Sequence, residues 1–449
     1  MLSRKVQVLQ ETIRKLLGVE TDRNLKNILD KTMPADIAQC MGAFDTAEQE
    51  KIIQCVSDLQ KQAAVLCEMD VDVTKDLLVR VGVDRAVQIL NFVSPDDAAD
   101  IVKKLPEDFS EQVLNRLHPE EGQEVETLIQ YRSESAGGIM SPEVFSLPED
   151  LTVRDAIREV QESRNVETVF YLYIVNRAGC LVGILSLKKL LLVPPESLLK
   201  DVMQRDPVRV RIDEDQEEVA KIVARYNFLS VPVVDENNKL VGVVTVDDVL
   251  DVIRDEATED ILLMTGAEKE AMEEAPLWQS LRRRMPWLLM TLLGGVVASE
   301  VIAGFSSVLL KTTVLVGFIP VVLGLGGNVG LQTMTIVVRG LAIGRLSLAD
   351  LGWVLFKELR VVLILGLLYG LLLAGFIALR YGYGTHIPVA IGMSIAGTML
   401  LSVSIGALIP IVFGKMGIDP AVATGPIVIT AFDILAMWLY FALAAFFLN

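Results

Sequence analysis

Histidine and paired cysteines are scarce in this 449-residue chain. It has only two histidines, which nearly excludes a catalytic or metal-binding cluster built on that residue. Its four cysteines show no C-x-x-C spacing, so we interpret them as buried thiols in a reducing compartment rather than a zinc site or a disulfide framework. The charged, amphipathic N-terminus (MLSRKVQVLQETIRK) shows no signal peptide.

Positive charge is scarce in the first 275 residues, which hold 31 basic and 53 acidic side chains. From Pro276 onward there are 10 basic and 5 acidic side chains in a strongly apolar sequence. The chain is too long for one domain, and this contrast predicts an acidic soluble half joined to a membrane half. A net charge of −22 on the soluble half argues against nucleic acid and anionic lipid as its partners and fits a protein that binds cations.

The last apolar stretch, residues 420–449, is long enough to cross a bilayer, which takes about 20 residues. It carries Asp433 near its midpoint, where a carboxylate is expensive unless it faces a partner, a cavity or a pore. Pro426 is expected to free backbone polar groups on the approach to this acid. Thr430 shares its helical face, and Asp419 falls about 40° from it around the helix. The pattern predicts a cation path; the alternative is an acid held by a neighbouring hydroxyl that only packs.

Five membrane spans are predicted, at about 286–308, 312–338, 361–379, 387–413 and 420–448. Eight basic loop residues fall on one side and two on the other, so the positive-inside rule places the soluble half in the cytoplasm and the C-terminus outside. Asp433 is then the only acid expected at mid-depth, which argues against an intramembrane aspartyl protease, because such enzymes need two. The role of Glu300, in the first span, stays open.

The second span contains FIPVVLGLGGNVGLQ, residues 318–332. Gly326, Gly327 and their neighbouring glycines predict a poor helix whose backbone can line a cavity. Close packing between helices is the alternative. Asn328 and Gln332, four residues apart, place two neutral amides on one face, which favours a polar path.

Residues 1–130 show helical spacing with almost no strand signal. A weak repeat at an offset of 61 relates residues 34–56 to 95–117, as in a small helical solenoid. Asp96 and Asp100 lie one turn apart on the helix opened by Pro95. They are either partners of that helix's dipole or half of a cation site.

Residues 137–256 contain a clearer repeat, in which LVGILSLKKLL (181–191) aligns with LVGVVTVDDVL (240–250). With the preceding helix and strand patterns, this stretch resembles a tandem pair of CBS domains. In that family a Thr/Ser-x-x-Asp after the last strand holds a nucleotide ribose. Thr245 and Asp248 keep the pattern, whereas Lys189 follows Ser186 in the first repeat, so the resemblance implies adenine nucleotide at one site only. Residues 254–287 then predict an acidic connecting helix with an apolar stripe.

In this order the parts resemble MgtE-type magnesium channels over essentially the full length. The motifs are P-x-x-L-G-x-G-G-N-x-G (320–330), the D-P-A…G-P…D pattern of 419–433 and VTVDDVLDVIRDEATEDI (244–261). The expected fold is a multidomain α and α+β protein with a polytopic α-helical membrane domain. Its expected parts are a helical N-terminal domain (1–130), a CBS pair (137–198 and 200–256), a connecting helix (257–284) and a five-helix pore domain (285–449).

The resemblance implies a homodimer in the bacterial cytoplasmic membrane, with magnesium as both cargo and regulator and ATP as a candidate ligand of the CBS pair. It implies that Asp433 of each subunit holds a magnesium ion, and the predicted pore residues are Gly326, Gly327, Asn328, Gln332, Gly425, Pro426, Thr430 and Asp433. It assigns to a cytosolic magnesium sensor Asp96, Asp100, Asp215, Glu217, Asp248, Asp251, Glu256, Glu259, Asp260 and Asp419. Asn227 stands where some relatives carry an acid. A proton- or sodium-coupled divalent cation exchanger is the alternative function.

Overall fold

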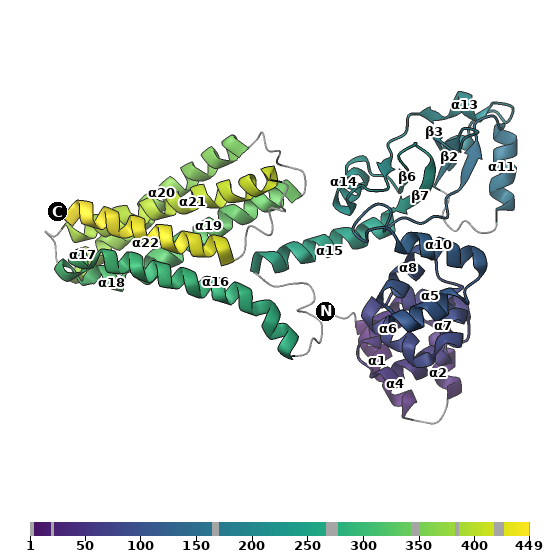
Figure 1. The fold of residues 1–449 in the computed structure, drawn as a ribbon, viewed down its shortest axis with the longest axis horizontal. Helices are drawn as coiled ribbons and strands as arrows, with labels where there is room; N and C mark the ends of the chain where they lie inside the picture. The colour runs from purple at the N-terminus through teal and green to yellow at the C-terminus, as the bar shows by residue number, and fades with distance from the viewer. Residues whose placement is uncertain are drawn as a thin grey trace. The chain divides into compact units, whose positions relative to one another are not determined.

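The computed structural model describes residues 4–18, 22–163, 170–265, 277–342, 346, 351–381, 386–416 and 426–448. The chain forms two compact units, Met1–Val252 and Ile253–Asn449, and each is described by itself. Figure 1 shows the helices and strands of both units, with labels where there is room.

The first unit begins with a stack of short helices, as the sequence predicts. Their bounds are α1 Arg4–Leu17, α2 Asp22–Lys31, α3 Pro34–Met41, α4 Thr46–Cys55, α5 Leu59–Cys67, α6 Val71–Val81, α7 Val83–Leu90, α8 Pro95–Lys104, α9 Glu107–Leu114 and α10 Pro119–Ile129. Local signals set the ends. Asp45 and Glu48 form a capping box at α4, and Pro95 occupies the first turn of α8, where its missing N–H costs nothing. Helices α3 and α4 begin 61 residues before α8 and α9, which confirms the repeat.

The rest of the first unit contains two small sheets related by the second repeat. The first runs in the order β1-β2-β3-β4 and the second in the order β5-β6-β7. The strands are β1 Ser146–Pro148, β2 Tyr171–Val175, β3 Leu181–Ser186, β4 Gln204–Arg205, β5 Val210–Arg211, β6 Ser230–Val234 and β7 Leu240–Thr245. Helices α11 Val153–Glu162, α12 Leu187–Leu190, α13 Leu199–Val202 and α14 Gln216–Tyr226 accompany them. Both β2 and β3 precede β6 and β7 by 59 residues, and each pair is antiparallel.

The helical stack and the second sheet share one hydrophobic core, which extends from Val6 to Val252. The segment between them is hydrogen bonded to the second CBS repeat, with the N–H of Ala136 donating to the Glu214 carbonyl at 2.7 Å and that of Gly137 to the Ile212 carbonyl at 2.9 Å. Gly138 allows a tight turn here, because a Cβ would lie 2.2 Å from the Arg132 carbonyl oxygen. The two parts of the unit are therefore joined by backbone pairing as well as by packing.

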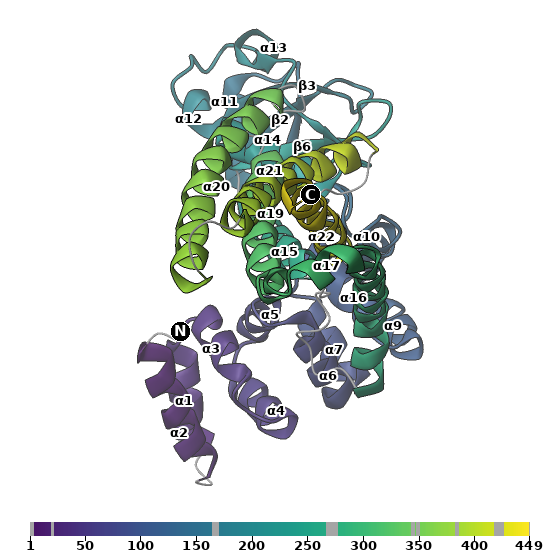
Figure 2. The same ribbon diagram turned by 90° about the vertical axis from the view of Figure 1, so that its left-hand side faces the viewer.

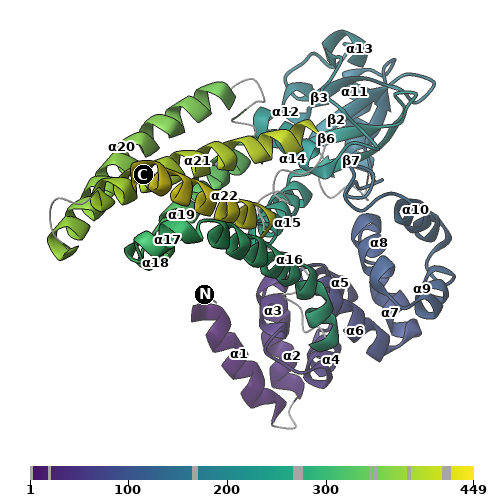
Figure 3. The same ribbon diagram turned by 60° about the vertical axis from the view of Figure 1, so that its left-hand side comes forward.

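Five helices of the second unit are long and apolar enough to cross a membrane, as predicted. The helices of this unit are α16 Leu277–Gly304, α17 Ser306–Lys311, α18 Val314–Gly317, α19 Ile319–Ala342, α20 Leu351–Tyr381, α21 Ile387–Lys415 and α22 Pro426–Leu448. Helix α21 packs against α19, α20 and α22 and is the central helix of the group (Figure 3). Helix α16 packs against α22 (Figure 2).

A single helix, α15 (Val246–Thr265), leaves the second CBS repeat and includes the start of the expected connecting helix. The middle of that expected helix, residues 266–276, lies outside the described residues. Leu263 packs beside Met334, Val338, Val428 and Phe432, at the ends of α19 and α22. The apolar stripe expected on the connecting segment therefore has a contact in the membrane unit.

The expectation that the second span would be a poor helix is wrong, because α19 is helical throughout. A glycine costs about 1 kcal/mol in a helix, but a bilayer leaves backbone groups no other partner. Close packing explains Gly326, Gly330 and Gly340 of this helix, whereas a Cβ on Gly324 or Gly327 would meet nothing within 4 Å. A Cβ on Gly406 of α21 would lie 2.5 Å from the carbonyl oxygen of Gly330, and one on Gly370 of α20 would lie 2.6 Å from that of Gly392. Backbone meets backbone at both crossings.

Gly406→Ala is expected to destabilise the membrane unit, since the added methyl group would press on the Gly330 carbonyl and separate α19 from α21. Overpacking of this kind costs about 1–3 kcal/mol. Gly375→Ala, on an exposed face of α20 with no atom within 4 Å, is the matched control and should not destabilise. Thermal unfolding in detergent should show a lower midpoint for Gly406→Ala alone; equal midpoints would contradict the close crossing.

Candidate ion-binding sites

Helix α22 holds Asp433 between two anchored positions. The ring of Phe432, 1% exposed, packs against Gly330 of α19. Two turns further on, the buried Tyr440 hydroxyl donates to the Leu315 carbonyl at 2.9 Å, and the Ser394 hydroxyl donates to the Tyr440 carbonyl at 3.3 Å. These contacts fix the rotation and height of the helix.

The Asp433 side chain itself is half-buried, and no hydrogen bond or ion pair is found between it and the other described residues. A carboxylate in apolar surroundings costs several kcal/mol when it has neither water nor a cation beside it. The alternative in which a neighbouring hydroxyl holds the acid therefore finds no support among the described residues. Thr430 faces α16 instead, where its methyl group fills the space beside Gly294. Its buried hydroxyl has no partner in the described part of the chain.

The amides predicted to share a face of α19 do so. Asn328 and Gln332 are both exposed on the single chain, and a Cβ on Gly327 would meet nothing within 4 Å. Gly326 is different, because a Cβ there would lie 3.2 Å from the Ser402 hydroxyl oxygen of α21. Gly327 therefore lies on the open side of α19, and Gly326 lies at the packed contact with α21.

Pro426 is the first described residue of α22, and residues 417–425 before it lie outside the described residues, so its predicted effect on the backbone stays a prediction. Two other residues assigned by sequence, Asp419 and Gly425, lie outside the described residues.

Sequence reasoning missed Glu358, because the third span was expected to begin at about residue 361. Helix α20 begins at Leu351, and Glu358 is 9% exposed within it. Helices α20 and α21 run antiparallel, with Gly370 against Gly392, so Glu358 lies about level with residue 404 of α21. That level adjoins the Gly406–Gly330 crossing and hence the depth of Asp433. A second buried acid, which the sequence analysis did not anticipate, therefore lies near the level of Asp433.

Glu300, whose role was left open, is exposed on α16, close to the end of that helix at Gly304. Among the described residues, no contact is found between Glu300 and the predicted pore residues Asp433, Asn328 and Gln332.

In the first unit, acids from distant parts of the sequence lie close enough to affect one another electrostatically. Burial raises the pKa of Asp248, on α15, to about 7; the charges of Asp96 and Asp247 raise it further, and hydrogen bonds from Thr245 oppose the rise. Burial and the neighbouring Asp97 raise the pKa of Asp96, on α8. One buried Asp96 oxygen has no hydrogen-bond partner in the described chain. The fold thus brings Asp96 and Asp248 to one acidic face.

Asp100 extends this face along α8. Its side chain is 53% exposed, yet the surrounding protein desolvates the carboxyl group and raises its pKa to about 6. Lys103 and Lys104 oppose the rise, and Asp96 and Asp97 add to it.

The other sensor candidates have more local contacts. Asp215 accepts a hydrogen bond from the Glu217 N–H at 2.9 Å and caps α14, and Glu217 pairs with Lys221 at 3.2 Å. Asn227, where some relatives carry an acid, ends α14 in a left-handed conformation. Asp251, Glu256, Glu259 and Asp260 lie along α15, each with polar or electrostatic contacts.

Within the described ranges, no three His, Cys, Asp or Glu side chains lie close enough to hold a metal ion. A cation at the acidic face would therefore keep part of its water shell or take ligands from elsewhere.

The nucleotide motif of the second CBS repeat forms a helix cap. The Thr245 hydroxyl donates to Asp248 at 2.5 Å at the start of α15. In the first repeat, the Ser186 hydroxyl accepts from the Lys189 N–H at 3.2 Å, so lysine stands where an acid would be. The two sheets meet where Tyr173 and Ser230 share a hydrogen bond of 2.8 Å.

Five apolar spans, one of which carries an acid without a partner among the described residues, are joined to a CBS pair and an acidic helical stack; together with the matches below, they place the chain among membrane transport proteins for divalent cations rather than enzymes. Residues 319–443 match the family model described as a divalent cation transporter. Residues 32–134 match the MgtE intracellular N domain, and residues 136–196 and 199–255 match the CBS domain. The chain belongs to the MgtE family of magnesium transporters.

Relatives cover most of the chain. It is 39% identical over 334 residues to the magnesium transporter MgtE of Thermus thermophilus, covering 73% of each chain. It is 30% identical over 428 residues to that of Bacillus subtilis, covering 95% of this chain and 94% of the relative. The crystal structure of the cytosolic domain of the Mg²⁺ channel MgtE in complex with ATP matches with 33% identity and a TM-score of 0.52, over 54% of this chain and 99% of that one.

The raised pKa values predict how stability depends on pH in divalent-free buffer. An acid whose folded pKa is raised keeps its proton longer in the folded state, so stability falls as pH rises from about 4, the unfolded value, towards about 7. Asp248→Asn should flatten this fall, whereas Asp108→Asn, on an exposed part of α9, should leave it unchanged. Thermal unfolding of the cytosolic part of the purified full-length protein measures the effect. A slope unaltered by Asp248→Asn would contradict the burial of its charge.

Proposed function

We propose that this protein is a magnesium uptake channel of the cytoplasmic membrane whose pore passes Asp433. The observation that carries the proposal is a half-buried carboxylate in α22 that is held in place by Phe432 and Tyr440 and has no partner among the described residues. A divalent cation crossing the membrane supplies the missing positive charge. The family's transport of divalent cations supports this reading.

The chemistry of the side chains suits a hydrated ion. Mg²⁺ sheds water reluctantly, so a carboxylate with neutral amides that bind its water shell can select it without stripping it. Asn328 and Gln332 offer such amides on the open side of α19. Two charges moving inward through 100 mV gain about 4.6 kcal/mol, so uptake needs no other energy source.

We propose that the pore forms on the two-fold axis of a homodimer. In the single chain the amide face of α19 is exposed, and lipid tails offer an amide no hydrogen bond. A second copy placing the same face opposite would enclose a polar path, as an isologous interface does. We further propose cytoplasmic N-terminal domains and an external C-terminus, from the excess of basic residues at one set of span ends.

Gating follows from the acidic face of the first unit. Without cations, Asp96 and Asp248 repel each other across the contact between the helical stack and the second CBS repeat. Magnesium that binds between them favours the compact arrangement and, through α15, closes the pore in a cell replete with magnesium. The remaining sensor acids on α14 and α15 belong to the same proposal. It keeps the four parts named from the sequence, 1–130, 137–256, 257–284 and 285–449.

Adenine nucleotide is proposed as a ligand of the second CBS repeat only. A crystallised relative's cytosolic domain is in complex with ATP, and Thr245 and Asp248 here keep the ribose-binding pattern. The Lys189 position in the first repeat lacks the acid.

A proton- or sodium-coupled exchanger is the second candidate, and the buried Glu358 favours it. A carboxyl group at about the depth of Asp433 could carry a proton through a transport cycle. Uptake driven by a pH or sodium gradient in the absence of a membrane potential would support the exchanger. Uptake that follows membrane potential alone would support the channel.

Asp433→Ala is expected to lower magnesium uptake into liposomes at least about tenfold, because the mutant loses the only charge proposed to hold the ion in the pore. Asp433→Asn, nearly the same size, should also fail, which separates charge from shape. Glu300→Gln, an exposed position on α16, is the matched control and should transport as the wild type does. Uptake unaffected by either Asp433 substitution would overturn the proposal.

A further inference from the structure

A lysine lies among the acids where the helical stack meets the second CBS repeat. Lys103 follows Asp100 by three residues on α8, and its ammonium nitrogen lies 4.0 Å from an Asp100 carboxylate oxygen. The same nitrogen donates to the Ser133 hydroxyl at 3.4 Å. The Lys103 side chain is 17% exposed, less than any other lysine in the ion pairs of the described residues.

Ser133 places this ammonium at the joint between the two parts. The segment that begins there is paired with the second CBS repeat: the carbonyl of Glu134 accepts from the Gln216 N–H at 3.1 Å, and Ser135 forms a bridge with Asp215. Lys103 therefore links α8 to the strip of backbone that pairs with the start of α14.

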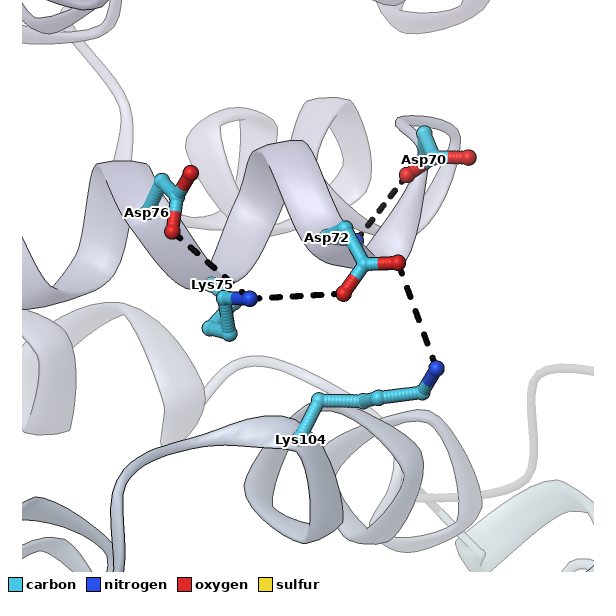
Figure 4. Close-up of polar contacts among 5 residues, drawn as sticks. All are labelled: Asp70, Asp72, Lys75, Asp76 and Lys104. Atoms are coloured by element: carbon cyan, nitrogen blue, oxygen red, sulfur yellow. Dashed lines mark hydrogen bonds and ion pairs between the residues drawn. The ribbon is translucent and has the colours of Figure 1, made fainter. Parts of the chain in front are cut away.

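The neighbouring Lys104 has a different setting. Its nitrogen lies 4.0 Å from Asp72 of α6, inside the helical stack, and Asp72 is also 3.4 Å from Lys75 (Figure 4). The two consecutive lysines therefore lie in different environments. Lys104 pairs within the stack, and Lys103 faces the joint.

Magnesium bound to the Asp100 oxygen that contacts Lys103 would lie within roughly 6 Å of the ammonium, since Mg–O bonds are about 2.1 Å long. Like charges so close repel each other, and the burial of the Lys103 side chain weakens the screening by water. The ammonium must then move away or weaken the binding of the metal. When magnesium is scarce, it partly neutralises the same acids.

We propose that Lys103 is a tethered counter-cation that competes with magnesium for the acids of the joint and so sets the concentration at which the cytosolic part compacts. The inference rests on the proposed gating and concerns its threshold. If magnesium has to displace the ammonium, compaction needs a higher magnesium concentration. If the ammonium stays in place, it weakens the repulsion among the acids without magnesium and opposes the binding of magnesium, so the two states differ less in electrostatic energy.

The test uses purified full-length protein and the magnesium concentration that gives half-maximal protection from chymotrypsin. Lys103→Met keeps the apolar stem and removes the charge, so the half-maximal concentration should fall about threefold or more. Lys103→Arg keeps a cation and should respond as the wild type does. Lys104→Met removes the same charge one residue away and is the matched control; because Lys104 pairs with Asp72 and acts on Asp100 more weakly than Lys103 does, its shift should be clearly smaller than that of Lys103→Met.

The outcomes separate the two proposals. A wild type whose protection ignores magnesium overturns the gating proposal, and this one with it. Magnesium-dependent protection with an unshifted Lys103→Met overturns only the role of Lys103. A higher half-maximal concentration in Lys103→Met would also overturn it, since it would make the lysine a structural link between α8 and Ser133. Lys103→Gln, with a polar end that can still donate, repeats the charge test if the methionine variant misfolds.

Discussion

Carboxylates placed where the protein supplies too little positive charge are the constraint on which the structure depends. The first 275 residues carry 22 more acids than bases, and the fold brings Asp96 and Asp248 together instead of spreading them apart. In the membrane unit, Asp433 is half-buried without a partner among the described residues. Confining such charges costs several kcal/mol each. We propose a divalent cation as the complement at both places, as cargo in one and as regulator in the other.

The packing of the membrane unit shows how the fold holds the Asp433 carboxylate in place despite the free energy that its burial costs. Helix α21 is joined to α19 and α20 through glycine crossings in which backbone meets backbone, and these contacts are dense and rigid. They hold α22 through Phe432 and Tyr440, on either side of Asp433. The acid cannot relieve its position by a small shift of its helix. Rigid packing therefore keeps a destabilised charge where an ion can use it.

Repeats and membrane spans could be read from the sequence because each rests on a local pattern. Helix starts 61 residues apart and strands 59 residues apart follow from matching apolar positions and from Pro34 and Pro95 at the starts of α3 and α8. Glu358 was missed because a stretch containing Lys357 and Arg360 reads as a loop, whereas these side chains lie on the exposed face of α20 over aromatic rings and leave the acid inside. The glycines of α19 led to the wrong expectation of a poor helix, because helix propensities are measured in water, where exposed backbone groups can bind water instead. The proximity of Asp96 and Asp248 depends on the tertiary structure, and no local sequence pattern predicts it.

The distance between the helical stack and the CBS pair tests the central claim most directly. Labels at Gln112 on α9 and Glu159 on α11, both exposed, would report it in full-length protein lacking the native cysteines. The account predicts a short, narrow distance distribution at saturating magnesium and a longer, broader one without magnesium. Asp248→Asn should make the magnesium-free protein more compact, because one of the two repelling charges is gone. Distributions that ignore both magnesium and the substitution would contradict the claim that missing positive charge controls the structure.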